Sequence, residues 1–326
     1  MHTKHSMHFY SEFSGQEDIR DLRSDELDSI LVYKDNNNLT NIRVHTCDYQ
    51  VEQFYSWYTK KGLQLYEDDL FLISADTMKL HNSTLSTEFN TKFISLNWRW
   101  TLHRHMIVSW LQTTSSKHIS WPYKSDINHL TGTPWLDIFN LSLSNEKIYF
   151  RVLQGLNELN EKVPLCIDIQ LSEPTTHTHA YHKSILPFGK TVYEFSQKDN
   201  SERVEEFYRD SFVDIVTESR FAQFTSNYSE KAYQAMFYKK PFIMVAPPYT
   251  LQYMKTHGFQ TFSDFWDESY DTETDHQKRL FKIFELIDAI DSMTIEDCRA
   301  MYKEMLPIIE HNWKLTNAII NKEDNK

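Results

Sequence analysis

The sequence predicts an α/β protein whose strands are mostly parallel. Short apolar runs of strand length alternate along the chain with segments of helical periodicity, which is the order that βαβ units produce. The chain has 326 residues, of which 40% are hydrophobic and 14% aromatic, and this is enough to fill two ordinary cores. We therefore expect two α/β domains.

The first half predicts a sheet with helices between its strands. The expected strands span residues 41–46, 69–74, 92–97 and 164–171, and the expected helices span 49–61 and 103–112. Residues 113–160 are rich in Ser, Thr, Asn and Pro, and this composition predicts loops with short helices. A polar stretch then runs to about residue 191, so we place the domain boundary near residue 180.

The second half shows a clearer alternation. The expected strands span residues 212–216 and 241–245, and the expected helices span 229–239, 250–257, 274–291 and 294 onward. Gly258 predicts a helix stop, Thr274 to Gln277 has the spacing of a capping box, and Pro307 predicts a bend in the last helix. The predicted units are residues 1–180, residues 181–293, and a terminal helix in 294–326 that packs back on the first unit.

Charge and composition disfavour several classes of function. The 34 basic and 46 acidic residues give a net charge of −12, a field that repels a polyanion such as nucleic acid. Six glycines form neither a GxGxxG nor a GxxxxGK loop, which disfavours dinucleotide and P-loop chemistry. Three widely spaced cysteines indicate a reducing compartment. With no transmembrane run and no apolar core of a signal peptide at its start, the expected location is the cytoplasm, without a membrane partner.

The segment from Ser211 to Arg279 carries the strongest functional signal. Two apolar strands flank a short, mostly apolar helix that opens with Glu230 and Lys231. A helix start already carries partial positive charge and free amide donors, so a lysine in its first turn gains nothing from the helix dipole. The arrangement makes sense if an anion such as a diphosphate binds there.

Five sequence blocks carry a resemblance to a known family. They read KFISLNWR at residues 92–99 with His103 and Arg104 close behind, SEK at 229–231, KPFI at 240–243, GFQTF at 258–262 and DESYD at 267–271. In this order they resemble a family of glycosyltransferases found in phages, large viruses and some bacteria, whose members usually read LNRR, HR, TEK, GF-TF and DESYD. Here Trp98 stands in the place of the first arginine, and Ser229 stands in the place of the threonine.

The donor half is also similar, more distantly, to α1,3-fucosyltransferases. That resemblance implies a GT-B architecture, in which two Rossmann-like domains face each other across a cleft. It implies that Glu230 bonds the ribose hydroxyls and that Lys231 meets the phosphates of a nucleoside-diphosphate sugar, with Ser229 beside them. The alternative is that Glu230 only closes the helix start as a capping residue.

Other polar residues offer phosphate contacts or have structural explanations. Glu218 ends a strand at the edge where ligands of parallel sheets bind, or it is an exposed strand-end carboxylate. Arg104 and Arg99 have the planar donor pairs that suit a leaving diphosphate, or one of them forms an interdomain or helix-start ion pair. The DESYD carboxylates suggest a divalent metal, or are helix-start and loop charges, the interpretation we favour. The histidines at 177, 179 and 182 give at most a weak metal motif, so we expect no metal requirement.

The expected reaction is transfer of a sugar from a nucleoside diphosphate to an acceptor hydroxyl of a glycan, a small molecule or a modified DNA base. An inverting enzyme needs a base, and Asp48, Asp76 and His103 are the candidates, among which the sequence does not choose. Two alternatives remain. The first is a phage enzyme that glycosylates a hydroxymethylated DNA base through a local basic groove. The second is a non-catalytic binding protein on a degenerate transferase fold.

Overall fold

The computed structural model describes residues 86–97, 101–121, 146–162, 201–222 and 228–323, together with short segments between residues 6 and 67. Within these ranges the protein is mixed α/β, as the sequence predicts. The early segments include a parallel sheet of three short strands, β1 (Ser6–Met7), β2 (Ile42–Thr46) and β3 (Leu63–Glu67), in the order β1-β2-β3. The strand expected at 41–46 is therefore present as β2.

A parallel sheet of four strands forms the centre of the better described part. Its strands are β4 (Thr91–Leu96), β5 (Lys117–Ser120), β6 (Ser211–Thr217) and β7 (Phe242–Val245), in the spatial order β5-β4-β6-β7. Every residue of β6 and β7 is buried, because both faces of the sheet are covered by helices. This burial explains why these two strands are mostly apolar, with Asp214 as the one charged residue in them.

The sheet joins segments from both halves of the chain. β4 pairs directly with β6, with Phe93 opposite Val213 and Ile94 opposite Asp214. The boundary that we expected near residue 180 therefore does not separate two sheets here, since β4 and β5 precede it and β6 and β7 follow it.

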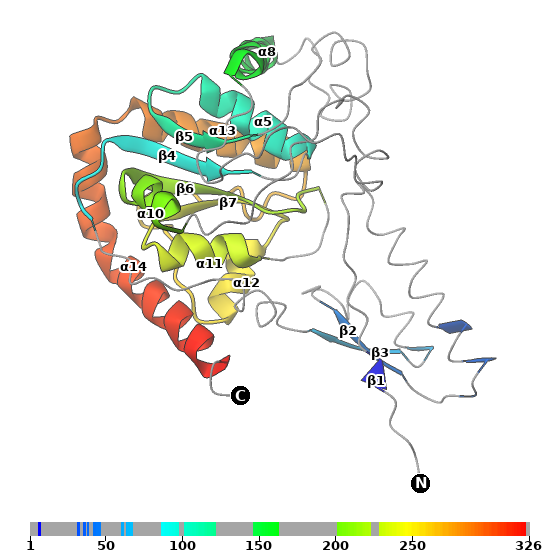
Figure 1. The fold of residues 1–326 in the computed structure, drawn as a ribbon. Coiled ribbons are helices and arrows are strands. Elements are labelled where there is room, and N and C mark those ends of the chain that lie inside the picture. The colour runs from blue at the N-terminus through cyan, green and yellow to red at the C-terminus, as the bar shows by residue number, and fades with distance from the viewer. Residues whose placement is uncertain are drawn as a thin grey trace, which may run out of the picture.

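Helices cover the two faces of this sheet (Figure 1). On one face lie α5 (Leu102–Gln112), α8 (Glu146–Lys162) and α13 (His276–Ser292), and the rings of Trp110 and Phe284 stack at 4.1 Å between α5 and α13. On the other face lie α10 (Ser201–Arg209) and α11 (Glu230–Phe237), where Tyr208 stacks on Tyr238 at 4.4 Å. β4 contributes side chains to two hydrophobic clusters. Phe93 packs in the larger cluster, and Ile94 packs with Tyr208 in a smaller one.

The last helix, α14 (Ile295–Glu323), runs through Pro307 and contacts both halves of the chain. Near its start Arg299 donates to the carbonyl of Phe89, at the edge where β4 begins, and further along the helix packs on α11 (Figure 1). The helix α12 (Thr250–Thr256) follows β7 along the chain and ends before Gly258. Gly258 has a φ of 86°, the left-handed conformation that commonly ends a helix.

Three local predictions differ from the structure. Residues 113–160 contain the strand β5 and the 17-residue helix α8, where we expected loops with short helices. The helix α10 was not predicted, and α13 is capped by Asp275, whose carboxylate accepts from the Lys278 amide at 3.0 Å, so Thr274 is not the N-cap. The expected strands at 69–74 and 164–171 and most of the helix at 49–61 lie outside the described residues.

Within the described part of the chain, no helix combines the length and apolar character needed to cross a membrane.

Candidate functional site

The strand order creates a topological switch point between β4 and β6. The chain leaves β4 through α5 to reach β5 on one side, and leaves β6 through α11 to reach β7 on the other side. Because the two connections diverge, the carboxyl ends of β4 and β6 border the position where ligands of open parallel sheets bind. Asn97 and Glu218 are the residues that directly follow these two strands.

A buried side-chain network ties the two strand ends together. Asn97 is fully buried, its Oδ1 accepts a hydrogen bond from Thr217 Oγ1 at 2.5 Å, and its Nδ2 donates to Ser95 Oγ at 2.9 Å. Ser95 in turn donates to the carbonyl of Ile215 at 3.2 Å. We did not single out Asn97 from the sequence, although it lies in the KFISLNWR block at residues 92–99.

His103 reaches across from the first turn of α5 to the end of β6. Its Nε2 lies 2.8 Å from the carbonyl oxygen of Glu218, so this nitrogen carries the proton and donates it to the carbonyl. Burial, the charge of Arg104 and that of Arg279 lower the pKa of His103 to about 3, against the raising effect of the Glu218 carbonyl. The ring also stacks on Phe221 at 5.2 Å. These contacts make His103 a fixed hydrogen-bond donor and leave it a weak proton acceptor.

Arg104 follows on the same turn and is almost fully buried, with 1% of its surface exposed. Its Nη2 donates to the carbonyl of Thr217 at 2.9 Å and lies 3.4 Å from Ser219 Oγ. Through these two contacts the guanidinium holds the loop that follows β6.

A second buried arginine, which the sequence reasoning missed, comes from α13. Arg279 donates through Nη1 to the carbonyl of Glu273 at 2.6 Å and through Nη2 to the carbonyl of Phe221, and its guanidinium carbon lies 4.4 Å from the Phe221 ring centroid. Burial lowers the pKa of Arg279 to about 10, while Asp271 and Glu273 act to raise it. The sequence did contain a signal for this residue, because Arg279 lies directly before Leu280 within the apolar stripe of the helix.

The start of α11 meets the end of β6. Ser229 is the N-cap residue of α11, and its amide donates to Glu218 Oε1 at 2.7 Å. The Lys231 ammonium nitrogen lies 3.0 Å from Ser229 Oγ, so this half-buried lysine folds back over the helix start. Glu230 is the first residue of α11, and only its backbone is described. Thus Glu218, Ser229 and Lys231 come together at one strand-to-helix junction.

The remaining candidates are not part of this geometry. Arg99, Asp48 and Asp76 lie outside the described residues, as do the histidines at 177, 179 and 182. Among the residues that are described, no group of three or more His, Cys, Asp or Glu side chains is arranged to hold a metal ion.

The DESYD carboxylates bind backbone amides. Asp271 accepts from the amides of Leu251 and Gln252 at 2.9 and 3.1 Å and so caps α12. Glu268 accepts from the amide of Phe262 at 2.8 Å and from Thr261 Oγ1 at 2.6 Å. Burial raises the pKa of both carboxyl groups, and these hydrogen bonds act against it. The favoured interpretation of this segment as helix-start and loop charges fits these contacts.

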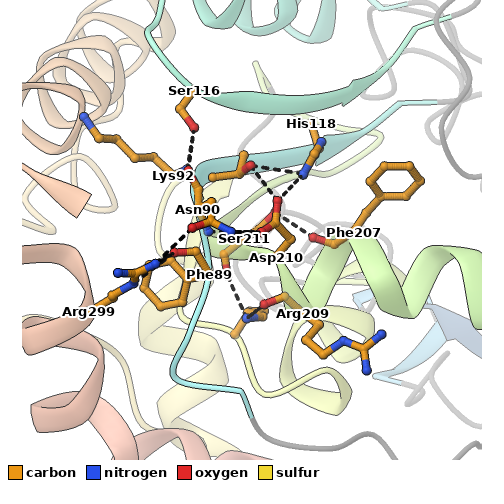
Figure 2. Close-up of polar contacts among 12 residues, drawn as sticks. Phe89, Asn90, Lys92, Ser116, His118, Phe207, Arg209, Asp210, Ser211 and Arg299 are labelled. Atoms are coloured by element: carbon orange, nitrogen blue, oxygen red, sulfur yellow. Dashed lines mark hydrogen bonds and ion pairs between the residues drawn. The ribbon is translucent and has the colours of Figure 1, made fainter. Parts of the chain in front are cut away.

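A second polar cluster lies at the opposite edge of the sheet, where β4 and β6 begin. Figure 2 shows His118 and Asn90 directed at Asp210, whose carboxylate accepts from the Asn90 amide at 3.0 Å and from Thr91 Oγ1 at 2.8 Å and pairs with His118 Nε2 at 3.0 Å. Burial raises the pKa of Asp210, but hydrogen bonds from His118 and Thr91 outweigh it, and the pKa is lowered. Thr91 Oγ1 and His118 Nε2 also lie 3.1 Å from each other, so the cluster ties together the starts of β4 and β5 and the residue that precedes β6.

Comparison of the chain with protein-family models, with curated proteins and with solved structures gives no match.

Proposed function

We propose that this protein is a glycosyltransferase that uses a nucleoside-diphosphate sugar as donor. The observation that carries the proposal is the junction of Glu218, Ser229 and Lys231 beside the switch point of a parallel sheet. A lysine ammonium at the positive end of a helix dipole favours a dianionic ligand, and the carboxyl edge of such a sheet is where nucleotides bind.

In the proposed complex the diphosphate binds the first turn of α11 and Lys231. Arg104 and Arg279 add positive charge from behind the β6 loop while remaining bonded to its carbonyls. Glu230, following the resemblance, orients the ribose. Transfer breaks the bond between the anomeric carbon and the diphosphate oxygen, forms a bond from that carbon to the acceptor oxygen, and moves the hydroxyl proton to a base.

The proposal includes a GT-B arrangement in which the early part of the chain supplies the acceptor side. A parallel sheet, β1-β2-β3, supports an α/β unit there, and Asp48 follows the carboxyl end of β2 by two residues. We assign the base to Asp48 or Asp76, since the Nε2 proton of His103 is bound to Glu218 and its pKa is about 3. No metal is required in this mechanism, because basic side chains and helix amides stabilise the leaving diphosphate.

The first test is the thermal stability of the protein with UDP, GDP and related nucleotides. A ligand present at 100 times its Kd stabilises the folded state by about 2.7 kcal/mol. We expect such a shift with one nucleotide diphosphate, and we expect Lys231→Ala to abolish it. Lys278→Ala, which removes an exposed lysine from α13, is the matched control and should keep the shift. If no nucleotide shifts the transition of the wild-type protein, the proposed function is wrong.

A further inference from the structure

Three side chains hold the backbone carbonyls of the loop that follows β6. Arg104 binds the carbonyl of Thr217, His103 binds that of Glu218, and Arg279 binds that of Phe221. The first two come from α5 and the third comes from α13, helices that lie together on one face of the sheet (Figure 1). The carbonyls of residues 217, 218 and 221 are therefore directed at donors from α5 and α13.

This arrangement fixes the direction of the loop amides. In a planar trans peptide the N–H group of a residue points opposite to the carbonyl of the residue before it. The amide of Glu218 illustrates the rule, because it donates to the carbonyl of Val245 while the Thr217 carbonyl faces Arg104. By the same rule, the amides of Ser219 and Ala222 point away from His103 and Arg279.

These two amides are available to a ligand. Ser219 and Ala222 are exposed, although Arg220 and Phe221 between them are buried. Neither amide donates to an acceptor within the described part of the chain. The loop adjoins the start of α11, because the Glu218 carboxylate binds the amide of Ser229.

The charge at this loop also favours an anion. Arg104 and Arg279 are each only 1% exposed, and their guanidinium groups donate to the backbone carbonyls of Thr217, Glu273 and Phe221. The buried Nε of Arg279 has no acceptor among the described residues. A bound anion interacts favourably with such charges because the surrounding protein screens them less than water does.

We propose that the loop of residues 217–222 is a backbone cradle for the diphosphate, in which the amides of Ser219 and Ala222 bind phosphate oxygens beside Lys231. This cradle is the phosphate-binding subsite of the proposed glycosyltransferase, so the proposal rests on that function. His103, Arg104 and Arg279 are positioning residues in it, since they orient the loop carbonyls and do not touch the ligand.

The test measures binding of inorganic pyrophosphate and, separately, of nucleotide diphosphates by calorimetry. Ala222→Pro removes one amide from an exposed position, and Ala222→Ser is its control because it keeps the amide. Arg279→Lys keeps the charge but cannot span the carbonyls of Glu273 and Phe221, and Lys282→Met removes a partly exposed charge from the same helix as its control. We expect the proline and lysine variants to bind pyrophosphate about 10-fold more weakly, and we expect the two controls to bind as the wild type does.

The outcomes separate the cradle from the proposed function. If the wild type binds pyrophosphate and nucleotide but Ala222→Pro binds both with unchanged affinity, the cradle is wrong while the proposed function stands. If Ala222→Pro weakens pyrophosphate binding and no nucleotide binds the wild type, the cradle stands and the proposed function is wrong. If pyrophosphate does not bind the wild type, the cradle is overturned. The proline variant decides the matter even if Arg279→Lys fails to fold, because residue 222 is exposed.

Discussion

Asp214 lies in the middle of β6, buried between the sheet and α10, where a charged carboxylate is unfavourable. Only 3% of its surface is exposed, and its Oδ2 accepts a hydrogen bond from Tyr208 at 2.8 Å. Burial raises the pKa of Asp214 to about 7, against the lowering effect of the tyrosine hydroxyl. Replacing it by asparagine keeps the shape and an oxygen acceptor for Tyr208 but removes the ionisation.

The sign follows from the difference between the folded and unfolded states. The folded protein holds a proton on Asp214 up to about pH 7, whereas the unfolded chain releases it near the ordinary pKa of 3.8. Stability from this group is therefore complete below pH 3.8 and is lost as the pH rises towards 7. Because each unit of pKa difference corresponds to about 1.4 kcal/mol, the loss amounts to about 4 kcal/mol.

The assay is urea unfolding of the wild-type protein and of Asp214→Asn at several values between pH 4 and pH 8. We expect the free energy of unfolding of the variant to exceed that of the wild type by an amount that grows by up to about 4 kcal/mol across this range. Asp264→Asn, at an exposed position, is the control and should follow the wild type. Parallel profiles for the wild type and Asp214→Asn would refute the reasoning.

Three further predictions concern stability. A Cβ at Gly155 would lie 1.8 Å from a backbone carbonyl oxygen of α5. Gly155→Ala should therefore lower the free energy of unfolding by about 3 kcal/mol, whereas the control Asn157→Ala, at an exposed position of the same helix, should leave it unchanged. Burial lowers the pKa of Lys240 to about 7, so wild-type stability falls as the pH drops from 10.5 towards 7. Lys240→Met should therefore gain roughly 5 kcal/mol relative to the wild type over that interval, measured by thermal or urea unfolding. Asp271→Ala removes the cap of α12 and should lower the midpoint of urea unfolding by an amount equivalent to about 1 to 2 kcal/mol.

The elements that the sequence predicts well are those whose pattern is set by local burial. β6 and β7 are mostly apolar because helices cover both faces of their sheet, and β4 carries the apolar pair Phe93 and Ile94. The helix α5 was predicted within one residue of its observed start. The start of α11 was also predicted, because the expected helix begins at Ser229 and Ser229 is the observed N-cap.

The elements that the sequence reasoning missed depend on packing between distant segments. α8 carries an apolar stripe at Val152, Leu156 and Leu159, but the many polar residues around this stripe led us to predict loops there. Its close contact with α5 depends on Gly155. β5 has only four residues and borders the sheet as an edge strand, so neither its length nor its alternation gives a clear signal.

The roles of the basic residues could not be predicted for a different reason, which is that they depend on strand order. A motif that contains His103 and Arg104 suggests contacts with a ligand, because both residue types bind phosphate. Once β4 is placed beside β6, however, the first turn of α5 faces the carbonyls at the end of β6 and those donors are occupied. Arg279, some 175 positions further along the chain than Arg104, completes the same set from α13. The contacts that we propose for the diphosphate are then the amides that this set turns outward and the ammonium of Lys231, so in this proposal a buried cation shapes the backbone and the backbone makes the contact.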